Sequence, residues 1–299
     1  MRPEPPSTDE PEIVLRPAAK LNLSLEVLGR RADGYHELAS VFQAIDLRDT
    51  LRILPGENLR LECAAPGLSG EGNLALRAAC LLRAEAGVSA GACLRLEKGM
   101  PVAAGLGGGS ADAAAALVGL ARLWNLALPP GRLAELAARL GSDVPFFLGP
   151  PTALARGRGD ELSPLPPPAA HWAIVVRPAQ CQPPPDKTRR LYAALRPEDY
   201  RDGAATAALA EDLRAGRPLD PALLTNSFER AARELFPEVA EAEAALLAAG
   251  AEWVHLAGSG PCLYTLIPDE PGGIELARSA TDFLRVTGRD VYLARTLAR

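Results

Sequence analysis

The stretch from Pro101 to Asp112 has the residue types of a phosphate-binding loop. Four glycines occur between positions 105 and 109, and Ser110 opens an alanine-rich segment typical of a helix. Glycine allows positive φ and a close approach of the backbone to a ligand. The first turn of a helix leaves N–H groups unpaired at the positive end of its dipole. The sequence therefore predicts an anion site, most simply for phosphate, with a flexible loop before a stable helix as the alternative.

Two familiar phosphate-binding motifs do not fit this loop. The Walker A motif requires a lysine directly after the glycines, and none follows here. The dinucleotide fingerprint Gly-x-Gly-x-x-Gly lacks its last glycine, because Ser110 stands in that position. The loop therefore belongs to another class of phosphate site.

Four further stretches carry polar or charged residues beside small or apolar ones. Asp143 follows a predicted helix end at Gly141 and is either a turn-stabilising aspartate or a general base. Lys20 is either a solvated residue at a strand end or a functional cation. The four stretches are Lys20-Leu21-Asn22-Leu23, Asp33-Gly34-Tyr35-His36, Ser142-Asp143-Val144-Pro145 and Ala257-Gly258-Ser259-Gly260.

The elements that must position these residues follow from hydrophobic periodicity. Alternating apolar residues from Leu21 to Val27 predict a half-buried strand with Lys20 and Asn22 on its polar face. Further strands are expected at 38–47, 50–54, 59–63 and 92–98. Helices are expected from an Asn73 cap to about 86, at 110–124 and at 129–141.

A proline cluster at 164–168 predicts a domain boundary. Beyond it we expect strands at 172–177, 252–256, 262–267 and 290–295, and helices at 187–195, 205–215, 223–235, 237–249 and 273–286. Without the extra helices, the order β-α-β-β-α-β is the ferredoxin-like arrangement. The predicted organisation is an α+β fold with a disordered tail at 1–12 and domains at 13–163 and 164–299.

Composition excludes several classes of protein. The 299 residues are 48% hydrophobic and 23% charged, as expected for a soluble globular chain. A net charge of -5 and 5% aromatic residues argue against a nucleic-acid partner. The chain has neither an apolar run of membrane-spanning length nor the apolar core of a secretory signal, so we expect a cytoplasmic protein. Five widely spaced cysteines predict buried free thiols rather than disulfides or a zinc site.

Together, the five motifs resemble the GHMP kinase superfamily, which includes homoserine, mevalonate and galactose kinases. The resemblance extends from about Val14 to the C-terminus. The Lys-Leu-Asn-Leu, Asp-Gly-Tyr-His and Ser-Asp-Val-Pro-Phe-Phe stretches are more narrowly similar to the members that act on 4-diphosphocytidyl-2-C-methyl-D-erythritol. The resemblance implies a two-domain fold, with an N-terminal ATP-binding domain and a C-terminal ferredoxin-like domain. It also implies ATP and Mg²⁺ as cofactors, and phosphorylation of the 2-hydroxyl of this cytidine diphospho-sugar alcohol in non-mevalonate isoprenoid biosynthesis.

The resemblance also implies the catalytic residues. Asp143 matches the base that accepts the hydroxyl proton. Lys20 matches a lysine beside this base and the acceptor hydroxyl, where a positive charge favours the ionised form of both. Asn22 lies two residues further on the same strand face and is expected to hydrogen-bond the substrate.

Residues for the cytidine and diphosphate groups are implied in the same way. Tyr35 is expected to stack on the base and His36 to hydrogen-bond its edge, with Thr188 and Tyr192 forming a second wall and Tyr192 opposite Tyr35. The stretch 180–186 is longer and richer in proline than is usual in the family, which leaves the register of Thr188 and Tyr192 open. The predicted contacts with the substrate diphosphate are Gly258, Ser259 and Gly260.

On the ATP side, the glycine loop is expected to surround the triphosphate with backbone amides. Lys98 has a solvated strand end as its alternative, and Asp112 is not assigned to the metal, because an acidic residue in a first helical turn is also favoured by the dipole. The metal ligands stay unassigned. The predicted ATP-binding residues are Asn73, Leu74, Lys98, Pro101, Gly105, Leu106, Gly107, Gly108, Gly109 and Ser110.

Three other functions explain the motifs less well than a kinase acting on this cytidine diphospho-sugar alcohol. A GHMP kinase with another acceptor, such as homoserine, does not require the Asp-Gly-Tyr-His stretch. A non-catalytic nucleotide-binding protein does not require both Lys20 and Asp143, and a purely structural protein requires neither glycine motif. We expect small-molecule substrates as partners, no nucleic acid or membrane, and a monomer or weak homodimer.

Overall fold

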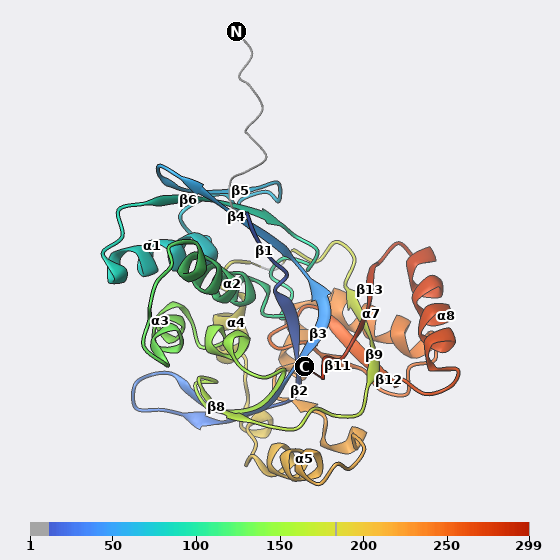
Figure 1. The fold of residues 1–299 in the computed structure, drawn as a ribbon. Helices are drawn as coiled ribbons and strands as arrows, with labels where there is room; N and C mark the ends of the chain where they lie inside the picture. The colour runs from blue at the N-terminus through green and yellow to red at the C-terminus, as the bar shows by residue number, and fades with distance from the viewer. Residues whose placement is uncertain (1–11, 183, 299) are drawn as a thin grey trace. The chain divides into compact units, whose positions relative to one another are not determined.

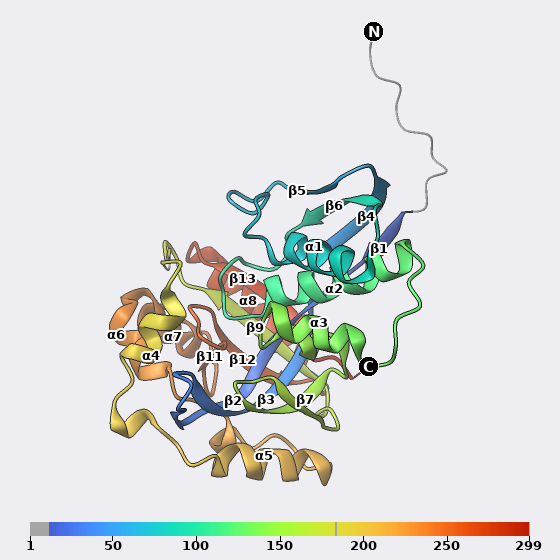
Figure 2. The same ribbon diagram turned by 90° about the vertical axis from the view of Figure 1, so that its left-hand side faces the viewer.

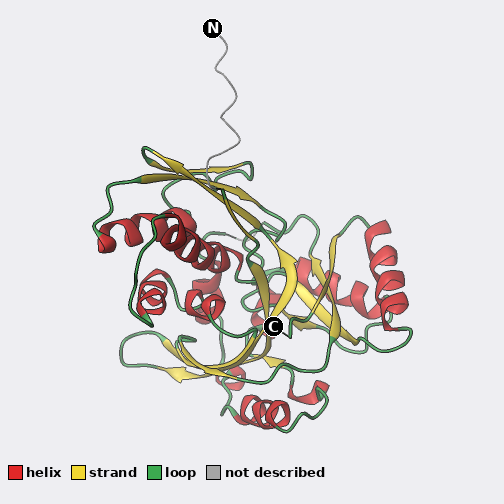
Figure 3. Ribbon diagram, in the orientation of Figure 1, coloured by secondary structure: helices red, strands yellow, loops and turns green. Residues whose placement is uncertain are grey.

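The computed structural model describes residues 12–182 and 184–298, and it confirms the α+β class (Figures 1 and 3). Of the predicted tail, only Glu12 is among the described residues. The described residues form two compact units: unit 1 consists of residues 12–17, Arg48–Gly99 and Gly109–Leu148, and unit 2 of Ala18–Leu47, Met100–Gly108 and residues 149–182 and 184–298. Each unit is built from three separate segments of the chain, so no single position in the sequence divides one unit from the other. Domains at 13–163 and 164–299 therefore stay a prediction.

Unit 1 contains a four-stranded sheet in the order β1-β4-β6-β5. Figures 1 and 2 show α1 and α2 on one face of this sheet. The packing is close, because a Cβ atom at Gly119 of α2 would lie 2.4 Å from the Cδ1 atom of Ile53 in β4. The elements are β1 (Ile13–Leu15), β4 (Thr50–Gly56), β5 (Leu59–Cys63), β6 (Gly91–Glu97), α1 (Leu74–Ala86), α2 (Gly108–Leu123), α3 (Arg132–Leu140) and η1 (Val144–Leu148).

The helix ends in unit 1 follow local sequence signals. Asn73 caps α1, since its side chain accepts the backbone N–H of Ala75 at 2.8 Å. Gly87 ends α1 in the left-handed conformation, with φ 63°. The cap and stop predicted for this helix are confirmed, whereas α3 begins at Arg132 rather than at the preceding prolines.

One sheet of unit 2 has five strands in the order β10-β2-β3-β7-β8. The strands are β2 (Ala18–Arg30), β3 (His36–Arg48), β7 (Thr152–Gly157), β8 (Glu161–Pro164) and β10 (Thr225–Asn226). The sequence patterns predicted β2 and β3 but missed β7, β8 and β10. A strand as short as β10 carries no periodicity by which it could be recognised.

A second sheet of unit 2 has the order β11-β12-β9-β13 and is antiparallel throughout. Its strands are β9 (His171–Arg177), β11 (His255–Leu256), β12 (Leu263–Pro268) and β13 (Asp290–Arg295), and α8 (Gly273–Val286) packs on β9 and β13. Counted along the chain this order is 2-3-1-4, so the ferredoxin-like prediction is confirmed. The expected strand at 252–256 is reduced to its last two residues.

The remaining helices of unit 2 are α4 (Lys187–Ala193), η2 (Pro197–Asp199), α5 (Ala204–Arg214), η3 (Pro221–Leu223), α6 (Glu229–Leu235) and α7 (Pro237–Ala248). The single helix predicted at 223–235 is wrong. Asn226 pairs in parallel with Leu25 of β2, and its side chain accepts the backbone N–H of Phe228 at 3.0 Å. The chain therefore turns before α6 can begin.

The prediction that β2 is half buried is also wrong, because its polar face is covered. Lys20, Asn22, Ser24 and Glu26 are at most 3% exposed. Helix α5 lies on this face: the hydroxyl of Thr206 donates to Ser24 Oγ at 2.9 Å, and the backbone N–H of Thr206 donates to Glu26 Oε2 at 2.8 Å. Glu26 thus satisfies a free N–H group in the first turn of α5.

The five cysteines are free, as predicted, but Cys80 is exposed and Cys63 only partly buried, so burial holds for three of them. Within the residues that the structure describes, no helix is long and apolar enough to cross a membrane.

Candidate functional site

The glycine loop adopts the backbone conformations that its composition predicts. Gly105 and Gly107 have φ of +83° and +72°, and Ala103 has φ +56°, which is uncommon for a residue with a side chain. At Gly105 a Cβ atom would lie 1.8 Å from the carbonyl oxygen of Ala257. Only glycine fits there, because this loop packs directly on the backbone of the second glycine motif.

The second motif, from Gly258 to Gly260, forms a tight turn between β11 and β12. The N–H group of Gly260 donates to the Ala257 carbonyl at 2.7 Å. The side chain of Asn226 donates to the carbonyl of Leu256 at 2.9 Å and to that of Gly258 at 2.8 Å. Both glycine turns therefore form one backbone cluster in unit 2, with Asn226 as a support that the sequence patterns did not single out.

Lys20 and Asn22 lie beside this cluster in β2. The backbone N–H of Lys20 donates to the carbonyl of Leu106 at 2.9 Å. Its Nζ donates to Asn22 Oδ1 at 2.8 Å and lies 4.2 Å from the ring centroid of Phe42. The Asn22 amide in turn donates to Ser40 Oγ at 2.8 Å. The alternative of a solvated strand-end lysine is therefore wrong.

Tyr192 stacks on His36, with ring centroids 4.3 Å apart and planes 15° from parallel. Burial lowers the pKa of His36, and the positive charge of Arg30 lowers it further, so the neutral imidazole is favoured. A neutral imidazole offers one donor and one acceptor, as recognition of a base edge requires.

The other two residues predicted for cytidine have different partners. Thr188 Oγ1 is 3.1 Å from Ser259 Oγ, so it joins α4 to the second glycine turn. Tyr35 is 57% exposed, and the guanidinium of Arg158 lies 4.9 Å from its ring centroid. The roles of Tyr35, His36, Thr188 and Tyr192 toward a ligand stay predictions, and Arg158 is a neighbour that the sequence did not reveal.

In unit 1, Asn73 and Leu74 form the N-terminal end of α1. A Cβ atom at Gly109 would lie 3.6 Å from Leu74 Cδ1, so the start of α1 is close to the part of the glycine loop that belongs to this unit. Ser110 follows Gly109 in α2. The structure thus brings these four predicted ATP-binding residues to one end of two helices.

Lys98 is buried in ion pairs rather than solvated at a strand end. Its Nζ bonds Asp112 Oδ2 at 2.8 Å and also pairs with Asp49, whose side chain is fully buried. Burial alone would lower the pKa of Lys98, but the charges of Asp112 and Asp49 outweigh it and raise the pKa.

Asp112 lies beyond the first turn of α2 and is 2% exposed, so the helix dipole is not its main partner. Burial raises the pKa of Asp112 to about 7, a shift that Asp49 increases and Lys98 opposes. Its Oδ1 atom has no hydrogen-bond partner among the described residues. One cation between two buried carboxylates leaves an excess negative charge, which protonation of Asp112 removes.

Asp143 lies in the turn between α3 and η1, where the N–H of Val144 donates to the Gly141 carbonyl at 3.2 Å. The side chain is half-buried in unit 1. A place in a fixed turn agrees both with a turn-stabilising aspartate and with a general base, so the role of Asp143 as a base stays a prediction.

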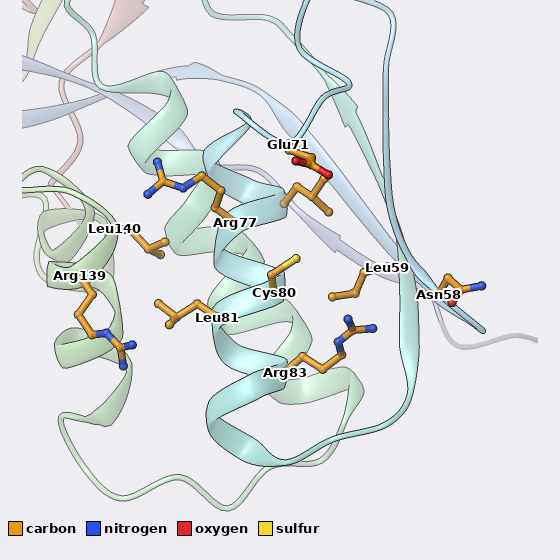
Figure 4. A pocket seen from close by; sticks show the side chains of 10 residues that line it. Asn58, Leu59, Glu71, Arg77, Cys80, Leu81, Arg83, Arg139 and Leu140 are labelled. Carbon is orange, nitrogen blue, oxygen red and sulfur yellow. The ribbon is translucent and has the colours of Figure 1, made fainter.

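A separate hollow of about 600 Å³ lies along α1 in unit 1 (Figure 4). Leu59, Leu81 and Leu140 provide apolar surface, and Arg77, Arg83 and Arg139 surround it. None of the predicted ATP-binding residues lines this hollow.

Comparison with known proteins identifies the class. The family described as GHMP kinases N terminal domain matches residues 73–149, and that described as GHMP kinases C terminal matches residues 204–285. A solved homoserine kinase from Cytophaga hutchinsonii has the same fold, with a TM-score of 0.71 at 17% identity over 98% of this chain and 96% of that one. The chain is a member of the GHMP kinases.

More similar relatives narrow this class. A protein of Pelotomaculum thermopropionicum named 4-diphosphocytidyl-2-C-methyl-D-erythritol kinase is 44% identical, covering 93% of this chain and 96% of the relative. A protein of Dehalococcoides mccartyi with the same name is 40% identical, covering 95% of this chain and 98% of the relative. A crystal structure of 4-(cytidine 5'-diphospho)-2C-methyl-D-erythritol kinase matches with a TM-score of 0.79 and 38% identity, over 95% of this chain and 99% of that one. The chain belongs to the 4-diphosphocytidyl-2-C-methyl-D-erythritol kinase family.

Proposed function

We propose that the protein transfers the γ-phosphoryl group of ATP to the 2-hydroxyl of 4-diphosphocytidyl-2-C-methyl-D-erythritol, in the non-mevalonate route to isoprenoids. The observation that carries the proposal is the cluster of both glycine turns with Lys20 and Asn22 in unit 2. Exposed backbone amides bind phosphate, while a lysine and an amide bind hydroxyl oxygens. Family membership supports the same activity.

In this reaction the hydroxyl oxygen forms a bond to the γ-phosphorus while the bond from that phosphorus to the β-γ bridging oxygen breaks. The products are the 2-phosphate and ADP. The hydroxyl proton passes to the carboxylate of Asp143, which later releases it to solvent. Lys20 favours the alkoxide by its positive charge, and its bond to Asn22 Oδ1 fixes the direction of its ammonium group. Catalysis in phosphoryl transfer rests largely on such positioning and charge stabilisation.

Recognition of the substrate would rest on unit 2. His36 and Tyr192 already form a stacked pair, to which a cytosine ring could add a further stacked layer. Tyr35 is exposed, with Arg158 beside its ring, and would cover the base. The hydroxyls of Thr188 and Ser259 would bind the diphosphate, together with backbone N–H groups of the second glycine turn other than that of Gly260, which already donates to the Ala257 carbonyl.

Mg²⁺ would enter bound to ATP and neutralise charge on its phosphates. Kinases commonly hold this ion through substrate phosphates and one or two carboxylates. Among the described residues, no group of three or more His, Cys, Asp or Glu side chains is placed to hold a metal. The donor set fits an ion held mainly by phosphate oxygens, and we assign it no protein ligand.

The direct test is incubation with ATP, Mg²⁺ and 4-diphosphocytidyl-2-C-methyl-D-erythritol, with ADP measured enzymatically and the 2-phosphate by ³¹P NMR. Homoserine and mevalonate serve as alternative acceptors. Equimolar ADP and 2-phosphate are expected with the cytidylyl substrate alone. Turnover of another alcohol without turnover of this one would contradict the proposal.

We also propose a cytoplasmic enzyme, since its phosphoryl donor is ATP, and a monomer or weak homodimer. Analytical ultracentrifugation over a range of protein concentrations measures the oligomeric state.

A further inference from the structure

Lys187 is a buried lysine to which neither the motifs nor the proposed reaction gives a role. It is the first residue of α4, which packs beside α6 in unit 2 (Figure 2). The residue is 7% exposed, although its neighbours Arg189 and Arg190 on the same helix are exposed. Burial of a lysine requires polar partners, because an unsatisfied ammonium group in the interior is costly.

The partners of Lys187 are two backbone carbonyls, one from each glycine turn. Its Nζ donates to the carbonyl of Ala103 at 3.2 Å and to that of Gly260. Ala103 has φ +56°, a conformation that is uncommon for a residue with a side chain, whereas glycine readily adopts the φ of +64° found at Gly260. One ammonium group therefore joins the two turns at a second point, beside the direct contact of Gly105 with Ala257.

The charge of Lys187 has no counter-ion in the described part of the chain. No carboxylate pairs with it, and its ionisable neighbours are the buried thiols of Cys181 and Cys262. Burial lowers the pKa of Lys187 to about 8, against the opposing effect of these thiols, so the ammonium form still predominates at neutral pH. A buried positive charge without a partner is stabilised when an anion binds nearby.

We propose that Lys187 is a positioning residue for phosphate groups: it clamps the glycine loop to the Gly258–Gly260 turn and supplies the positive charge that a bound diphosphate or triphosphate balances. Its hydrogen bonds go to carbonyls, so it acts through the two turns rather than by direct contact with the reacting atoms. The proposal rests on the proposed function for the identity of the ligands, ATP and a cytidine diphosphate compound. The clamp itself is a property of unit 2.

Ligand charge separates this role from a purely structural one. Lys187→Met removes the charge and the donors while keeping an unbranched side chain. The dissociation constants of CDP, cytidine, ADP and adenosine are measured by NMR titration on the variant and the unmodified protein. We expect about tenfold weaker binding of CDP, of ADP or of both, and less than about twofold change for the uncharged nucleosides. Comparison of the CDP and ADP titrations shows whether binding of the cytidine diphosphate, of the adenosine diphosphate or of both depends on Lys187.

Two variants complete the comparison. Arg189→Met removes a cation of the same helix whose side chain is 82% exposed, and it should leave all four constants within about twofold. Lys187→Arg keeps the charge and should recover at least part of the affinity for the phosphorylated ligands. If Lys187→Met does not fold, Lys187→Gln replaces it; if neither folds, the role is structural and the proposal is overturned.

Equal weakening of CDP and cytidine, or of ADP and adenosine, would also overturn the proposal, as would unchanged binding of all four ligands. These outcomes are independent of turnover. A protein that binds CDP and ADP but phosphorylates another alcohol would refute the proposed function and leave the test of Lys187 intact.

Discussion

The backbone N–H of Lys20 donates to the carbonyl oxygen of Leu106 at 2.9 Å. This bond joins the strand that carries the predicted catalytic lysine to the loop predicted to bind phosphate. A displacement of the glycine loop would therefore also displace Lys20. If the loop binds phosphate and Lys20 lies beside the acceptor hydroxyl, as proposed, this main-chain hydrogen bond couples the two sites.

Gly105→Ala should damage the protein more than Gly109→Ala. A Cβ atom at Gly105 would lie 1.8 Å from the Ala257 carbonyl oxygen, and φ there is +83°. At Gly109 the nearest atom is a leucine methyl at 3.6 Å, an ordinary contact. We expect Gly105→Ala to lower Tm by several degrees or to prevent folding, and Gly109→Ala to leave Tm nearly unchanged. Thermal unfolding followed by circular dichroism measures both, and equal Tm values would contradict the contact between the turns.

Asp143→Asn should lower kcat about 10²–10⁴-fold, the usual contribution of a general base. The amide has the shape of the carboxyl group but cannot accept the proton at neutral pH. Steady-state kinetics measures kcat, and titration with ADP checks that nucleotide binding is retained. A kcat within about threefold of the unmodified value would reject Asp143 as the base.

Tyr192→Ala and Tyr35→Ala should both raise KM for the cytidylyl substrate by about tenfold or more, since stacking of a base on an aromatic ring contributes about 1–3 kcal/mol. KM for ATP should not change in either variant. Tyr192→Ala should also lower Tm, because Tyr192 packs on His36 and Phe228, whereas the exposed Tyr35 should have little effect on stability. A rise in KM for ATP alone would place these rings at the other substrate.

Asp112 makes stability depend on pH. Its pKa is raised from an ordinary aspartate value to about 7 in the folded state, so between these values the folded protein holds a proton that the unfolded chain has released. The contribution of Asp112 to the free energy of unfolding is therefore greatest in acid and is lost as pH rises through about 7.

Asp112→Asn tests this assignment, because the amide does not titrate. Urea unfolding at about pH 5 and about pH 8 should show a smaller loss of stability with pH in the variant than in the unmodified protein. The two proteins differ only at position 112, so the difference between their pH profiles isolates the effect of Asp112. Parallel pH profiles would show that Asp112 remains ionised throughout.

Local sequence signals predicted the parts of the molecule that depend on neighbouring residues. The Asn73 cap, the Gly87 stop and the glycine conformations at 105 and 107 each follow from nearby chemistry. The order of strands and helices after the proline cluster was also sufficient for the ferredoxin-like sheet.

Contacts distant in sequence could not be predicted in this way. Thr206 reaches Glu26 across 180 residues, and this contact buries the polar face of β2 that alternation alone assigns to solvent. For Lys98 the sequence left two alternatives, an ATP-binding residue or a solvated strand end, and did not reveal its ion pairs, because Asp49 and Asp112 approach it only in the folded unit. Lys187 could not be distinguished from the exposed arginines that follow it, since burial of one face of a short helix leaves no pattern.

The polar interior of β2 has a consequence for how this enzyme could change its acceptor. A shift of β2 by one residue would exchange Asn22 and Ser24 for leucines and leave Ser40 and Thr206 without their partners. Asn22, which is predicted to bind the substrate, therefore also specifies the alignment of the strand. Variation at Asn22 that favours a new alcohol would loosen strand pairing at the same time, so acceptor preference should evolve more readily at the exposed Tyr35 than in β2.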